Sequence, residues 1–177
     1  PFNAANLLVI GLTSDQRLVC FSELSPSRLD NIGQVTGLSG DTALIGIDYR
    51  VQDGRLYGVG NAGGVYTIST VDGSATLVNN LTVALSGTAF GVDFNPAADR
   101  LRIISNTGQN LRHNVNTGGT TLNDGTLTYT APPATPVAAT GVAGAAYTNN
   151  DLDASTATTL FDIGSALDQV SIQSPAN

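Results

Sequence analysis

Gly46-Ile47-Asp48-Tyr49 and Gly91-Val92-Asp93-Phe94 are the stretches that decide the fold, and they lie 45 residues apart. The same shift places Arg55-Leu56 on Arg100-Leu101 without a gap. Self-similarity at a fixed period of about 20–50 residues is typical of solenoids and propellers. The sequence therefore predicts a repeated structural unit.

Each of the two clearest units contains four short runs with the alternation and β-branched residues of strands. Asp-Gly, Gly-Gly and Asn-Pro pairs separate the runs and supply the backbone conformations of tight turns. The predicted strands are 43–49, 55–59, 65–69 and 75–81 in one unit, and 89–94, 100–105, 109–115 and 119–122 in the next. Four antiparallel strands in about 45 residues are typical of a propeller blade.

Weaker copies flank this pair, which gives four units at about 7–38, 43–81, 89–127 and 141–177. We therefore expect one all-β domain over 1–177, a β-propeller-like array of about four antiparallel four-stranded blades. The first blade lacks its opening strand and the last is incomplete, so we also consider a C-terminally truncated or processed fragment. Three Pro residues in 131–136 predict an exposed loop between the third and fourth units, because proline lacks the donor that a central strand needs.

Composition excludes several functions. The net charge of −7 disfavours nucleic acid as a partner, and no apolar run is long enough to span a membrane. The sequence has no Lys, which excludes Schiff-base chemistry, and its single His, His113, excludes multi-histidine zinc sites. We read His113 as a surface or strand-packing residue, and Cys20, the only cysteine, as an inert core thiol.

Asp48 and Asp93 occupy equivalent positions of a first strand, and the first strand of a propeller blade lines the central channel. Their carboxylates could bind a ligand or a cation, or act as an acid and a base in glycoside cleavage. Arg55 and Arg100 recur one hairpin away. The four residues are therefore candidate channel-lining or ligand-binding groups, and the alternative interpretation is that Asp-to-Arg pairs brace each blade.

A second candidate site is Asn149-Asn150-Asp151-Leu152-Asp153. Oxygen-bearing side chains at Asn149, Asp151 and Asp153 alternate as at the start of a calcium loop. The central Gly and the distal Glu of the full loop are missing, so the alternative is a solvated turn. Calcium is the one cofactor that the sequence suggests.

The stretch from Phe94-Asn95-Pro96 to Ser105-Asn106-Thr107-Gly108-Gln109-Asn110-Leu111-Arg112 resembles a family of secreted, mostly bacterial proteins known only as a domain of unknown function, with propeller-like repeats. The similarity runs from about Leu12 to the C-terminus. It implies a propeller-like fold and export from the cell, and it implies no reaction. Members of the family continue with further strands beyond the equivalent of Ile172-Gln173-Ser174-Pro175.

We therefore expect a secreted, non-enzymatic scaffold for extracellular binding or assembly, with a glycan or surface polymer as ligand. One alternative is a fibre or matrix protein that self-associates by strand-edge pairing, or a fold that a companion chain completes. The other alternative is a glycoside hydrolase that uses Asp48 and Asp93.

Overall fold

The computed structural model describes residues 7–129, 135–153 and 155–175. These residues form strands, turns and loops, and the prediction of an all-β fold is confirmed. They contain no helix, and therefore no helix that is long and apolar enough to cross a membrane.

The strands form five antiparallel sheets, none of them closed within the described residues. The first sheet consists of β1 (Leu8–Leu12), β2 (Arg17–Ser22) and β3 (Asp30–Gln34), and the second of β4 (Leu44–Arg50), β5 (Arg55–Gly60), β6 (Gly64–Ile68) and β7 (Ala75–Asn80). The third sheet consists of β8 (Phe90–Asn95), β9 (Arg100–Ser105), β10 (Asn110–His113) and β11 (Thr121–Asn123). A short hairpin of β12 (Thr128–Tyr129) and β13 (Val137–Ala138) follows, and the last sheet consists of β14 (Val142–Tyr147), β15 (Leu160–Gly164) and β16 (Gln169–Gln173). The two four-stranded sheets match the two clearest sequence repeats.

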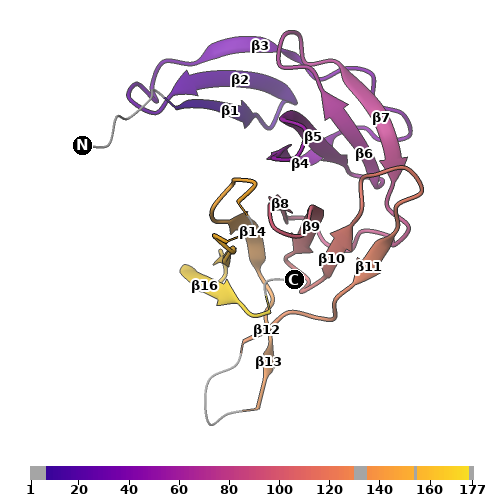
Figure 1. Ribbon diagram of the computed structural model, residues 1–177, viewed down its shortest axis with the longest axis vertical. Helices are drawn as coiled ribbons and strands as arrows, with labels where there is room; N and C mark the ends of the chain where they lie inside the picture. The colour runs from indigo at the N-terminus through magenta and orange to yellow at the C-terminus, as the bar shows by residue number, and fades with distance from the viewer. Residues whose placement is uncertain (1–6, 130–134, 154, 176–177) are drawn as a thin grey trace.

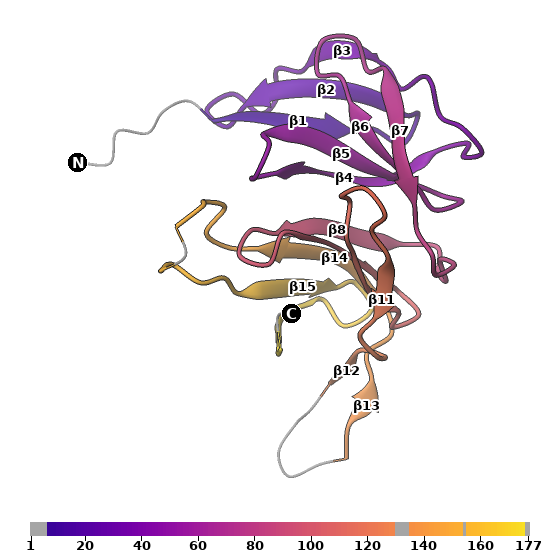
Figure 2. The ribbon, with the colours of Figure 1, turned by 45° about the vertical axis from the view of Figure 1, so that its right-hand side comes forward.

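The larger sheets follow one another along an arc in chain order (Figure 1). Strands β4, β8 and β14 lie towards the inside of the arc, and β3, β7 and β11 lie towards its outside. A second view shows the sheets layered one upon the next (Figure 2). Strand β8 packs against both β4 and β14, so the first strands of three successive sheets are side by side.

The glycine that opens each repeated first-strand motif has a packing reason. A Cβ on Gly91 would lie 2.5 Å from the backbone nitrogen of Ala145 in β14. A Cβ on Gly46 would lie 2.6 Å from a methyl carbon of Val92 in β8. A side chain at either position would force the first strands apart, and the glycines therefore permit their close approach.

Apolar side chains fill the spaces between neighbouring sheets. The core between the second and third sheets includes Tyr57 and Phe94, whose rings meet edge to face with centroids 5.2 Å apart. A second core joins the first sheet to the second around Leu18, Leu44 and Tyr66. A smaller one joins β9 to the last sheet. Hydrophobic packing between layers thus holds the array together.

The sequence did not predict the short hairpin of β12 and β13. Most of the proline-rich segment 131–136, read as an exposed loop, lies outside the described residues. The hairpin strands on either side of it are held by backbone hydrogen bonds from Leu127 to Gly108 and from Ala139 to Leu127. Leu127 and Ala139 are buried, and they anchor this hairpin beside the third sheet.

Candidate binding site

The carboxylates of Asp48 and Asp93 connect the first strands of successive sheets. Asp48 Oδ2 in β4 accepts a hydrogen bond from the backbone N–H of Phe94 in β8, at 2.7 Å. Asp93 Oδ2 in β8 accepts the backbone N–H of Tyr147 in β14, also at 2.7 Å. The same contact therefore occurs at two successive junctions, and each one ties a sheet to the next.

The two carboxyl groups also interact with each other. Burial raises the pKa of Asp48, against hydrogen bonds from backbone N–H groups. Burial and the negative charge of Asp48 together raise the pKa of Asp93 to about 8. A hydrogen bond between the two side chains follows when one of them is protonated. Burial and the neighbouring negative charge therefore both favour the protonated form of Asp93.

Both carboxylates serve as hydrogen-bond acceptors for the neighbouring first strand. Each accepts one backbone N–H, and the two side chains interact electrostatically with each other. Their chemistry is that of a structural link between strands.

Arg55 and Arg100 do not pair with these aspartates. Asp48 lies opposite Tyr57 in the β4–β5 register, whereas Arg55 lies opposite Arg50 at the strand end. Arg100 donates from Nη1 to the carbonyl oxygens of Ala98 and Asp99, in its own turn. Each arginine lies on the same face of its sheet as the expected aspartate, but two positions along the strand from the residue opposite that aspartate. No ion pair joins these residues in the described part of the chain, so these pairs do not brace the blades.

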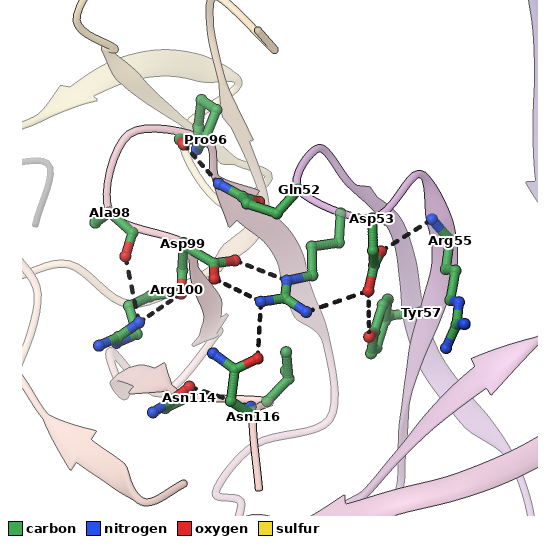
Figure 3. A network of polar contacts seen from close by, with 12 residues as sticks. Gln52, Asp53, Arg55, Tyr57, Pro96, Ala98, Asp99, Arg100, Asn114 and Asn116 are labelled. Atoms are coloured by element: carbon green, nitrogen blue, oxygen red, sulfur yellow. Dashed lines mark hydrogen bonds and ion pairs between the residues drawn. The ribbon is translucent and has the colours of Figure 1, made fainter. Parts of the chain in front are cut away.

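Arg50 braces the sheets instead. Its Nε and Nη2 bind Asp99 at 2.7 and 2.5 Å, Nη1 binds Asp53 at 3.1 Å, and Nη2 also binds Asn116 at 2.9 Å. Asp53 in turn accepts the Tyr57 hydroxyl (Figure 3). This network joins the β4–β5, β8–β9 and β10–β11 turns.

A second buried network surrounds Arg102, which is 0 % exposed. Its Nη1 donates to Asp124 Oδ2 at 2.6 Å and to Asn110 Oδ1 at 2.7 Å, and its Nε donates to the Tyr147 hydroxyl at 3.1 Å. Asp124 also binds Arg112 at 2.9 Å. Sequence reasoning missed both Arg50 and Arg102. An arginine between Leu101 and Ile103 in a buried strand was the available signal for the second.

A cavity of about 690 Å³ lies beside the Arg102 network, between the third sheet, the short hairpin and the last sheet. Hydroxyl, amide and carboxyl side chains line it together with apolar ones. The polar lining residues include Asn110, Asp124, Thr126, Thr128, Tyr129, Asp162, Gln169, Ser171 and Gln173. Its volume falls in the range of small-molecule sites.

Three residues of this cavity each carry a buried polar atom with no hydrogen-bond partner in the described part of the chain. The atoms are Asp162 Oδ1, the Tyr129 hydroxyl and Gln173 Oε1. Burial raises the pKa of Asp162 to about 6, against the charge of Arg102. Unpaired buried polar atoms cost free energy, and their gathering around one cavity is characteristic of a binding site.

The predicted calcium loop forms a self-contained turn. Asn149 donates its amide to the carbonyl oxygens of Thr156 and Ala157. Asp151 and Asp153 accept hydrogen bonds from residues within the same turn. No group of three or more His, Cys, Asp or Glu side chains suited to a metal occurs among the described residues.

His113 is fully buried in β10. Its Nδ1 lies 3.0 Å from Thr121 Oγ1, and its Nε2 lies 3.0 Å from Asn79 Oδ1. Burial lowers the pKa of His113 to about 4. The imidazole is therefore neutral and packs between strands.

Residues 17–177 match the model of a protein family described as a domain of unknown function, DUF4394. The chain belongs to this family. A comparison of the DUF4394 chain with curated proteins finds no match. The matched residues include all three strands of the last sheet, the Arg50 and Arg102 networks and the cavity. They begin after β1, at the first residue of β2.

Proposed function

We propose that this DUF4394 protein is a secreted, propeller-like scaffold that binds a hydroxyl-rich ligand, a glycan or related surface polymer, without reacting with it. The layered sheets and the first strands β4, β8 and β14, side by side, support a propeller-like arrangement. Location outside the cell rests on the sequence resemblance to secreted proteins.

The observation that carries this proposal is the 690 Å³ cavity with its mixed polar and apolar lining. Asp162 and Gln173 contribute unpaired acceptor oxygens, and Tyr129 contributes a hydroxyl that can accept or donate. A ligand rich in hydroxyl donors complements such a set. The apolar lining residues, Leu127, Ala139 and Val142 among them, suit the carbon faces of a sugar ring.

The surrounding structure favours a preformed site. Asp124 and Asn110 line the cavity and are fixed by Arg102. A site whose polar groups are already held in place loses less entropy on binding. Rigidity of this kind suits a binding role.

Binding to an immobilised glycan panel, followed by titration calorimetry with the best oligosaccharide, tests the proposal. Ser171 in β16 lines the cavity, so Ser171→Phe fills it and should weaken binding at least about tenfold. Thr76→Phe on the exposed surface of β7 is the matched control and should bind as the wild type does. The proposal fails if no glycan binds, or if Ser171→Phe binds as tightly as the control.

A second candidate function is self-association through the last sheet. Ile163, Val170 and Ile172 are 54 %, 67 % and 65 % exposed, and Ile163 lies directly opposite Val170. Strand β16 is also an edge of its sheet. Exposed apolar residues on an edge strand favour pairing with a second copy.

Sedimentation velocity over a range of concentrations tests this candidate. Wild-type protein should form larger species as concentration rises, and Val170→Lys should remain monomeric. A monomeric wild type at all concentrations contradicts it.

A further inference from the structure

The first sheet is equivalent to the later ones, with one strand fewer. Leu12 lies opposite Leu18 in the β1–β2 pair, as Val59 lies opposite Val65 in the β5–β6 pair. Gln16 has a positive φ of 63° in the intervening turn, where Gly63 has a φ of 98° in the other. Strands β1, β2 and β3 therefore correspond to β5, β6 and β7.

Within the described residues, the first strand of the later sheets has no counterpart in the first sheet. Strand β5 pairs with β4 on one edge, and β9 pairs with β8 in the same way. Among the described residues, β1 pairs with β2 alone. The edge of β1 that corresponds to the β4-binding edge of β5 is therefore open.

An apolar groove lies at this open edge. Its volume is about 210 Å³, and it is lined by residues 7–10 on one side and by Ile47, Asp48, Tyr49 and Leu56 on the other. Leu8 is 62 % exposed and Tyr49 is 42 % exposed. Both are large apolar side chains at a site where the later sheets hold a strand.

Backbone donors of β1 point into this edge. Thr13 donates its N–H to Arg17 of β2, and Glu23 donates to the carbonyl of Leu7. Because hydrogen-bonded residues alternate along an antiparallel pair, the odd-numbered residues of β1 face β2. The N–H groups of Leu8 and Ile10 consequently face the open edge.

The later sheets show which side chain a strand added at the open edge of β1 would carry. Each first strand that carries an aspartate presents it to the next first strand, Asp48 to Phe94 and Asp93 to Tyr147. Tyr49 occupies the position of Phe94 one repeat earlier. A strand paired with β1 would place the equivalent residue opposite Ile10 and within reach of the Tyr49 backbone N–H.

We propose that the open edge of β1 binds an extended segment of a partner polypeptide that reads Gly–apolar–Asp–aromatic, antiparallel to β1. Main-chain hydrogen bonds to Leu8 and Ile10 supply affinity, as in other cases of strand addition. The aspartate supplies specificity through the Tyr49 N–H. This inference does not depend on the glycan cavity, which lies at the other end of the array.

A synthetic peptide with the sequence of residues 42–51, labelled with a fluorophore, is the probe, and fluorescence anisotropy against the full chain is the readout. Saturable binding is the expected result. The peptide carrying Asp48→Asn should bind about tenfold more weakly, because a neutral amide replaces a charged acceptor.

Two variants of the full chain complete the test. Leu8→Pro removes one N–H from the open edge and should weaken binding at least about tenfold. Leu8→Ala keeps the N–H and, like Leu8→Pro, removes the leucine side chain. Its affinity for the peptide should remain within about threefold of that of the wild type. Circular dichroism confirms that both variants fold.

The inference is overturned if the peptide does not bind, or if Leu8→Pro binds it as well as Leu8→Ala does. It is also overturned if a second copy occupies the edge, which would appear as dimerisation that Leu8→Pro abolishes. Each of these results leaves the glycan-binding proposal untouched.

Discussion

Replacement of Asp93 by Asn separates the charge of this residue from its hydrogen bonding. The amide oxygen can still accept the Tyr147 N–H, and the amide nitrogen can donate to Asp48, as the protonated carboxyl group does. Asp93→Asn is thus a permanently neutral equivalent of protonated Asp93. Any difference from the wild type reports the titration of this group.

The raised pKa of Asp93 sets the direction in which the unfolding free energy changes with pH. The folded state holds the Asp93 proton up to about pH 8, whereas the unfolded chain releases it near pH 3.9. Between these values the folded state binds more protons, so this group makes stability fall as pH rises. The stabilisation that Asp93 contributes is fully present below about pH 4 and is lost as pH rises through about 8.

The change in unfolding free energy that titration of Asp93 can cause has an upper limit of roughly 6 kcal/mol, at about 1.4 kcal/mol per pKa unit. Partial exposure of the side chain and the coupled titration of Asp48 reduce it, and we expect about 2 kcal/mol between pH 5 and pH 9. Urea unfolding of both proteins at several pH values measures the difference. The stability advantage of Asp93→Asn over the wild type should be about 2 kcal/mol larger at pH 9 than at pH 5.

Asp30→Asn provides the control, because Asp30 is an exposed aspartate in β3. Its unfolding free energy should follow that of the wild type at each pH. Parallel pH profiles for Asp93→Asn and the wild type would refute the reasoning, as would a variant that is less stable at pH 9.

Three further predictions concern the core and the strand junctions. Phe94→Ala should lower the unfolding free energy by about 3–5 kcal/mol in urea titrations, because a buried ring in contact with Tyr57 is lost. Gly91→Ala should destabilise the protein by about 2 kcal/mol or more, because a Cβ would meet the Ala145 backbone. Gly54→Ala is the control: its Cβ meets no atom within 4 Å, and it should cost only about 1 kcal/mol because Gly54 has a positive φ. In NMR titrations the single imidazole, that of His113, should stay neutral down to about pH 4; because its pKa is lowered in the folded state, its contribution to stability is lost as pH falls from about 6.5 to about 4.

Part of the candidate sites could be read from the sequence. The repeat singled out Asp48 and Asp93 as equivalent residues, and the structure brings them together at successive strand junctions. Their partners could not be read, because a backbone N–H has no sequence signature. The cavity was missed for a similar reason: its lining comes from segments between Asn110 and Pro175 that no local pattern connects.

The sequence by itself determined the strands, the turns and the repeat. Alternating apolar residues and turn-forming pairs act over a few positions, so Arg55–Gly60 and Arg100–Ser105 were predictable as strands. Gly46 and Gly91 were recognised as repeated residues, but their close contacts with the next first strand appear only in the structure.

Only the tertiary structure decided which charged groups meet. Arg50 binds Asp99, and Arg102 binds Asp124, across different turns and strands. These pairings depend on the stagger and rotation of one sheet against the next, which arise from packing of whole layers. Local sequence specifies each sheet, and the geometry between sheets creates the junctions, the cavity and the open edge of β1.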